Sequence, residues 1–119
     1  MSILVIDEKR VVNRYLMHNL EVFIRESDER LGNVLNLSRS GMLIAHNDTI
    51  AVDSVRECRI PLGHTIIGLS DFEADARVKW VRQNDISGLF SSGFEFTDNT
   101  KEQWSWIQAM IDVFAISWV

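Results

Sequence analysis

The sequence predicts an all-β domain that ends in a helix, and three observations support this fold class. Between Leu20 and Thr97 apolar residues recur with a period near two, as in strands with one buried face. These segments are separated by clusters of Gly, Asn, Asp and Ser, which favour turns between antiparallel strands. After residues 98–100 the apolar period becomes helical. The length of 119 residues suits a single domain.

The clearest strand covers residues 73–80, where every second residue is apolar and the residues between are charged. This alternation predicts that Trp80, the last residue, belongs to the core. Weaker alternation marks the other strands, at 20–25, 31–37, 56–62 and 90–96, with short apolar runs at 42–45 and 65–69. Turn signals lie at 27–28, 46–48, 63–64, 70–71 and 83–85. Several short strands in series favour a closed or nearly closed barrel, which would leave no exposed edges.

The C-terminal segment predicts a helix of about four to five turns. Its apolar residues recur at helical spacing, at Trp104, Ile107, Ile111, Phe114 and Trp118. Thr100 and Gln103 have the spacing of a capping box at its start. The opposite side is also apolar, through Trp106, Ala109, Val113 and Ile116. Two interpretations stay open: a partner or a second copy in a homodimer covers this side, or the helix is simply an apolar core helix.

Composition excludes several classes of function. The net charge of −5 disfavours binding to DNA or RNA, since a long polyanion would be repelled. A single cysteine, Cys58, cannot form an internal disulfide, and no Cys/His spacing predicts a metal site or a cofactor. We find no signal peptide and no membrane span, and we expect a cytoplasmic protein. No residue stands out as a catalytic nucleophile, so the chain is not expected to be an enzyme.

Two short motifs carry the binding chemistry. The segment 9–14 holds three cations, Lys9, Arg10 and Arg14, and no acidic residue. An arginine can donate two hydrogen bonds to a phosphate or to a guanine edge. The interpretation without function is a solvated N-terminal arm.

The second motif is the segment 36–41, Asn-Leu-Ser-Arg-Ser-Gly. Asn36 and Ser38 share one face of an extended segment, and Gly41 permits a tight turn beside them. An amide and a hydroxyl at this place can bind a guanine base or a phosphate. Arg39 could add a further cation. A turn whose side chains cap their own backbone is the alternative.

Together, an Arg-x-x-x-Arg motif followed about 20 residues later by Asn-x-Ser-x-x-Gly resembles the paired signature of the PilZ family of cyclic di-GMP receptors. The resemblance extends over residues 8 to 115, including the segments 78–81 and 93–96. It implies a flexible N-terminal arm at 1–15, a six-stranded antiparallel PilZ-type β-barrel at 16–99 and the C-terminal α-helix at 100–119.

The resemblance also implies the ligand and its contacts. Arg10 and Arg14 would bind the phosphates and guanines of cyclic di-GMP, and Asn36, Ser38 and Gly41 would shape the base site. Lys9 would favour an intercalated pair of ligands. The arm would fold over the ligand and signal to an unidentified downstream protein in pilus, flagellar or exopolysaccharide pathways. Two alternatives remain: a PilZ-like adaptor that binds no nucleotide, and an enzyme acting on a small phosphate ester.

Overall fold

The structure, a computed structural model, describes residues 15–17, 20–66 and 68–118. Eight strands and one helix lie within these ranges. In chain order they are β1 (Tyr15–Met17), β2 (Glu21–Ile24), β3 (Arg30–Leu37), β4 (Gly41–His46), β5 (Val55–Ile66), β6 (Leu69–Gln83), β7 (Phe90–Phe96), α1 (Lys101–Phe114) and β8 (Ala115–Trp118).

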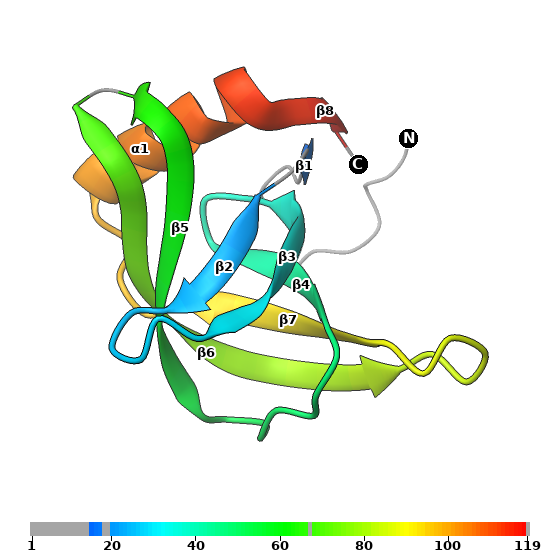
Figure 1. The fold of residues 1–119 in the computed structure, drawn as a ribbon. Coiled ribbons are helices and arrows are strands. Elements are labelled where there is room, and N and C mark those ends of the chain that lie inside the picture. Colours follow the sequence, from blue (N-terminus) through cyan, green and yellow to red (C-terminus); the bar gives the residue numbers. More distant parts are fainter. Residues whose placement is uncertain (1–14, 18–19, 67, 119) are drawn as a thin grey trace, which may run out of the picture.

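Six of the strands close into an antiparallel barrel (Figure 1). Their order around the barrel is β2-β5-β6-β7-β4-β3, and β3 pairs back onto β2. The predicted six-stranded barrel with a C-terminal helix is therefore confirmed. Its interior is filled by the apolar residues that alternate along each strand, among them Leu37, Met42, Ile44, Phe72 and Val78. Closure pairs the strand edges that an open sheet would expose.

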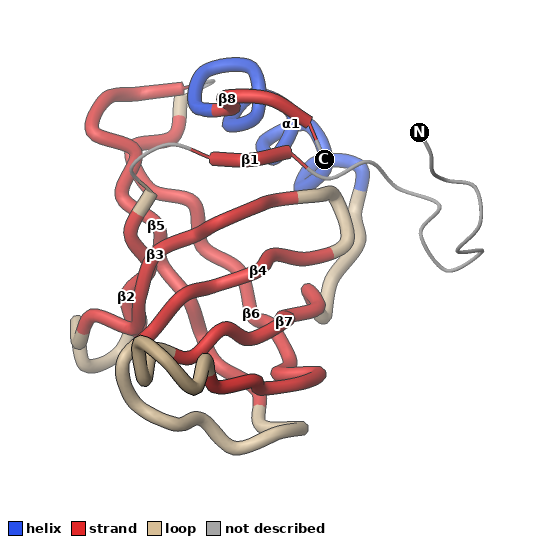
Figure 2. The backbone as a smooth tube through the Cα atoms, turned by 90° about the vertical axis from the view of Figure 1, so that its right-hand side faces the viewer, coloured by secondary structure: helices blue, strands red, loops and turns tan. Residues whose placement is uncertain are grey.

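The remaining strands, β1 and β8, extend the sheet beside β3. The first half of β3 pairs with β2, while its end pairs with β1 through Asn36 and Leu37. Strand β8 then pairs with the other edge of β1, so that Tyr15 lies opposite Trp118. Figure 2 shows β1 between β3 and β8, close to α1. Both ends of the described chain thus meet at the last residues of β3.

Helix α1 lies across one end of the barrel (Figure 1). It begins after Thr100, whose side chain accepts a hydrogen bond from the Gln103 backbone N–H, as a helix N-cap does. Ile107, Met110 and Ile111 are buried. Within the described ranges no helix is long and apolar enough to span a membrane.

The helix ends at Phe114 and does not continue to Trp118 as the apolar spacing predicts. Ala115 is extended, and the segment that follows pairs with β1. The sequence does not reveal this change from helix to strand, because the apolar residues of this short segment fit both the helical period and the period of two expected for a strand. The opposite side of α1 is partly covered: Ala109 is buried and Trp106 half-buried, while Val113 is exposed. Ile116, which the helical spacing placed on the same side, lies in β8 and is also exposed.

The hairpin between β5 and β6 also differs from the predicted turns at 63–64 and 70–71. Ile66 pairs with Leu69, so the turn lies between them and uses Gly68, whose φ is +76°. Gly63, with φ +79°, lies within the interval where the strand register shifts. A glycine at positive φ can serve a turn or an irregularity within a strand, so Gly63 alone could not place the turn.

Candidate ligand-binding surface

The corner between β3 and β4 is held together by Ser38. Its hydroxyl oxygen lies 3.3 Å from the backbone nitrogens of both Ser40 and Gly41, which donate to it. The Ser38 backbone N–H also donates to the Gly41 carbonyl over 2.9 Å. Ser38 is fully buried. These contacts match the alternative in which the motif caps its own backbone, and they fix the shape of the corner.

Gly41 is required by a close approach of strands. A Cβ on this residue would lie 2.1 Å from the backbone carbonyl oxygen of Phe94 in β7. No side chain fits at that distance without separating β4 from β7. The sequence suggested that a glycine is needed here for a tight turn, whereas it is needed because the neighbouring strand takes the space of a side chain.

Asn36 belongs to a row of residues on the outward face of the barrel sheet, where its own fractional exposure is only 9%. Successive strands pair Leu16 with Asn36, Asn36 with Leu43, Leu43 with Gly93, and Gly93 with Trp80. Directly paired residues project from the same face of a sheet. We call these five residues the outer row. At about 4.8 Å per strand, the row places Trp80 and Asn36 roughly 14 Å apart.

Trp80 is exposed, contrary to the prediction that it belongs to the core. Its fractional exposure is 39%. The register between β6 and β7 shifts between Val78 and Trp80, and such a bulge reverses the face on which the following residues lie. The alternation at 73–80 therefore holds through Val78 and fails for Trp80.

The indole of Trp80 lies over Gly93. Its Nε1 is 2.3 Å from the position that a Cβ of Gly93 would occupy. The ring therefore extends from β6 across β7, in the direction of Leu43 and Asn36. The guanidinium carbon of Arg82 is 5.1 Å from its centroid. An exposed indole with a cation beside it is a suitable surface for stacking a nucleobase. The sequence analysis did not include Trp80 among the candidate ligand contacts, because the alternation placed it in the core. Gly93, whose missing side chain leaves space for the indole, was the available sequence signal.

Arg39 projects from the corner toward α1. Its side chain is exposed, and its guanidinium carbon lies 4.7 Å from the centroid of the Trp104 ring. This is a cation–π contact. Within the described residues the structure thus gives Arg39 an aromatic partner at the edge of the candidate surface.

Lys9, Arg10 and Arg14 lie outside the described residues. Their point of attachment is nevertheless defined, because Arg14 is bonded to Tyr15, and Tyr15 pairs with Leu37 immediately before Ser38. Consecutive Cα atoms are 3.8 Å apart. The structure therefore brings the start of β1 to the Asn36–Gly41 corner.

One serine–histidine pair could be mistaken for a catalytic pair. His46 Nδ1 lies 2.6 Å from the backbone carbonyl of Asp48, which can only accept, so Nδ1 carries the proton. The other ring nitrogen, 2.6 Å away from the Ser92 hydroxyl, then accepts from it. Both residues are buried, so a substrate has no access to the pair. The hydrogen bond between Ser92 and His46 joins β7 to β4.

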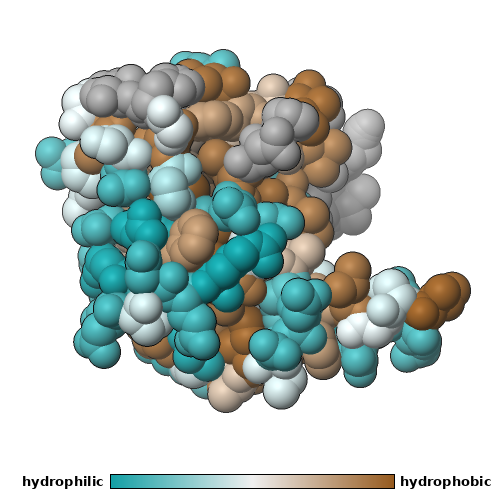
Figure 3. Space-filling model, viewed as in Figure 1, coloured by the Kyte–Doolittle hydropathy of each residue, from teal (hydrophilic) through white to brown (hydrophobic). Residues whose placement is uncertain are grey.

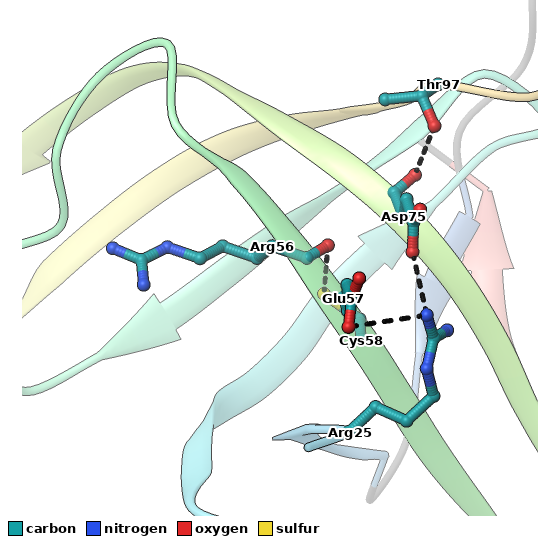
Figure 4. A network of polar contacts seen from close by, with 6 residues as sticks. All are labelled: Arg25, Arg56, Glu57, Cys58, Asp75 and Thr97. Atoms are coloured by element: carbon teal, nitrogen blue, oxygen red, sulfur yellow. Dashed lines mark hydrogen bonds and ion pairs between the residues drawn. The ribbon is translucent and has the colours of Figure 1, made fainter. Parts of the chain in front are cut away.

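Other polar groups form structural ties. In the network of Figure 4, Arg25 contacts Asp75 at 3.1 Å and Glu57 at 3.7 Å, which links the end of β2 to β5 and β6. Burial, with the nearby charge of Asp75, raises the pKa of the Cys58 thiol to about 12. This cysteine is therefore protonated and unreactive at neutral pH. The described part of the chain contains no cluster of His, Cys, Asp or Glu suited to a metal ion.

The fold defines a class, a small closed β-barrel with a helix across one end. A family model of the PilZ domain matches residues 8–112. The chain belongs to the PilZ domain family. This confirms the resemblance found in the sequence, and the predicted fold is that of the family.

Solved structures show the same fold at low sequence identity. The PilZ domain of YcgR from Escherichia coli with c-di-GMP aligns with a TM-score of 0.70 and 13% identity, covering 89% of this chain and 91% of that one. The Bacillus subtilis inhibitor of motility MotI/DgrA aligns with a TM-score of 0.68 and 18% identity, covering 90% and 51%. The K. pneumonia MrkH–c-di-GMP complex gives 0.67 and 11%, covering 88% and 52%. The chain spans about half the length of MotI and MrkH. No curated protein matches significantly.

Proposed function

We propose that the chain is a cyclic di-GMP receptor whose ligand lies on the outer row, between the N-terminal segment and the Asn36–Gly41 corner. The observation that carries the proposal is the pairing of Tyr15 with Leu37. Arg14 is one residue from this point and Arg10 five, or at most about 17 Å of extended chain. Both arginines can therefore reach a ligand on the outer row. Membership of the PilZ family and the cyclic di-GMP named for the YcgR and MrkH structures support it.

Each side chain has a proposed role. Arg10 and Arg14 bind phosphate and guanine, and Lys9 supplies charge for a second ligand molecule. Asn36 addresses a guanine edge, and Trp80 offers a face on which a base stacks. Ser38 and Gly41 act by holding the corner in shape. An uncharged amide at position 36 avoids repulsion of the dianionic ligand.

Calorimetric titration of the full chain with cyclic di-GMP tests the proposal. We expect micromolar or tighter binding, which Arg10→Ala or Arg14→Ala weakens by about 1.5–3 kcal/mol each, the value of a charge-assisted hydrogen bond. Arg25→Ala is the matched control. It removes the same charge from a side chain bound to Asp75, and we expect unchanged affinity. Absence of heat with the folded wild-type chain would favour the adaptor that binds no nucleotide.

We infer that the receptor acts in the cytoplasm by passing the signal to a downstream protein, without chemistry on the ligand. Prolonged incubation should return cyclic di-GMP unchanged, and any turnover would favour the phosphate-ester enzyme instead. Val113 near the end of α1 and Ile116 in β8, 49% and 64% exposed, are apolar residues that a partner could cover. A homodimer through α1 stays a prediction, which sedimentation of the chain with and without ligand would test.

A further inference from the structure

The contact between Arg39 and Trp104 joins the candidate ligand surface to the first turn of α1. Arg39 lies between Ser38 and Ser40, whose backbone atoms are fixed by the corner hydrogen bonds. The Ser40 carbonyl also accepts a hydrogen bond from Phe96 in β7 over 2.9 Å. The corner backbone is thus held on two sides, while the Arg39 side chain is exposed and free to change its direction.

The Trp104 ring offers Arg39 its face. Its Nε1 is buried and has no hydrogen-bond partner among the described residues, so the cation–π contact is the polar interaction that the structure gives this indole. At an exposed site such a contact is worth about two- to fivefold in an equilibrium constant. A hydrogen bond from a guanidinium to a phosphate is worth about ten- to a hundredfold. Arg39 therefore binds a phosphate within its reach in preference to the Trp104 ring.

We propose that Arg39 exchanges partners when the site fills. It stacks on Trp104 in the free protein and turns to a ligand phosphate in the complex. The first turn of α1 therefore loses its contact with Arg39 when ligand binds at the corner. This inference rests on the proposed function and deepens it. The contact with Trp104 then opposes binding, since it must be broken.

The position of α1 allows this exchange of partners to affect both parts of the candidate ligand surface. Its first turn is anchored by Gln103, whose side-chain amide donates to the Asp98 carbonyl over 2.7 Å. Its other end runs directly into β8, which pairs with β1, the strand that follows the proposed arm. One helix is therefore connected to both parts of the ligand surface, to the corner through Arg39 and to the arm through β8. The ring that Arg39 leaves becomes a new exposed aromatic face.

The test is ¹⁹F NMR of the full chain labelled with 5-fluorotryptophan, with the Trp104 resonance assigned by its loss in Trp104→Phe. Saturation with cyclic di-GMP should shift the Trp104 resonance. Arg39→Met, which keeps an unbranched apolar stem but lacks the charge, should shift it without ligand and reduce the further change on binding. Arg82→Met is the matched control. It removes an equivalent stack on Trp80 and should leave the Trp104 resonance of the free protein in place.

Affinity provides a second readout with a definite sign. Because the stack competes with the ligand, Trp104→Leu should tighten binding about two- to fivefold, while Arg39→Met should weaken it. If Trp104 instead preorganised Arg39 for the ligand, Trp104→Leu would weaken binding and overturn the inference. A saturated wild-type complex with an unshifted Trp104 resonance would also overturn it and leave the receptor function standing. A folded chain that binds no cyclic di-GMP would end both.

Discussion

Ser38 illustrates, at the scale of a single residue, how a binding motif can act through folding. The hydroxyl satisfies two backbone N–H groups of the corner, and the residue is fully buried. Such a side chain need not touch a ligand to be required for binding. The position of Asn36 and the direction of Arg39 depend on the corner that Ser38 closes.

Ser38→Ala should lower the free energy of unfolding by about 1–3 kcal/mol, because the Ser40 and Gly41 N–H groups lose their acceptor. Urea unfolding measures this loss. Ser40→Ala is the control, since the Ser40 hydroxyl contacts the Ser38 hydroxyl at 3.2 Å and accepts from no backbone N–H of the described residues, and its change should stay within about 0.5 kcal/mol. Equal losses in the two variants would contradict the assignment of the corner to Ser38.

Because of Cys58, we expect the free energy of unfolding to depend on pH in the alkaline range. Burial raises the pKa of its thiol from 9.0 to about 12, so between these values the unfolded chain releases a proton that the folded chain retains. The unfolded state then binds fewer protons, and stability falls as pH rises through this window, by up to about 1.4 kcal/mol per pH unit. Below pH 9 the thiol contributes no such dependence.

Urea unfolding of the wild type and of Cys58→Ala between pH 8 and 10.5 checks this effect. The cavity left by the smaller residue should make the variant less stable at pH 8. The difference should shrink as the pH rises, because the variant has no thiol to ionise. Parallel curves for the two proteins would refute the buried-thiol account.

Strand periodicity predicted much of the fold at the scale of elements. The alternation in 73–78 and the start of α1 are found in the structure, and the turn predicted at 83–85 lies just after Gln83, at 85–87. The prediction fails where a strand contains a bulge or a helix ends while the residues remain apolar. A bulge turns Trp80 outward, and α1 becomes β8 at Ala115, because pairing with a distant strand outweighs local spacing.

The sequence likewise predicted part of the candidate site and not the rest. Sequence motifs indicated the corner as a candidate, but they gave Gly41 the wrong reason, and the strand alternation wrongly placed Trp80 in the core. Both errors concern contacts between neighbouring strands of the barrel: Gly41 of β4 with Phe94 of β7, and Trp80 of β6 with Gly93 of β7. A motif specifies residue types along one segment, whereas these contacts are set by the register of β7 against β4 and β6.

Gly93 in β7 and Gly41 in the neighbouring strand β4 should therefore respond differently to substitution by alanine. In Gly93→Ala the new Cβ meets the Trp80 side chain, which can move, whereas in Gly41→Ala it meets the Phe94 backbone, which cannot. We expect Gly93→Ala to remain folded and to lose affinity for cyclic di-GMP through the displaced indole. Gly41→Ala should lose more of its stability. Thermal unfolding and calorimetry separate the two effects, and an unchanged affinity in folded Gly93→Ala would remove Trp80 from the site.

At the scale of the whole molecule, the candidate ligand surface and the far end of the β6–β7 hairpin, residues 84–89, form separate regions. The hairpin projects from the barrel and carries apolar residues at its far end (Figure 3), where Ile86 is 97% exposed. Its turn is held by the Asn84 side chain, which accepts from the N–H groups of Ile86 and Ser87 over 2.9 Å each. The turn thus supplies an internal reference for changes that ligand binding confines to the arm and the corner.

Hydrogen exchange of the full chain tests the proposed closure of the arm. In the proposed function Arg10 and Arg14 gain phosphate contacts only when the segment before Tyr15 is ordered, so cyclic di-GMP should slow amide exchange in residues 8–17 and leave residues 84–89 unchanged. Arg14→Ala, measured at a ligand concentration that saturates it, should recover only part of this protection. Protection confined to the corner, with the arm exchanging as in the free protein, would mean that the ligand is held without closure. The signal to a partner would then have to pass through α1 alone.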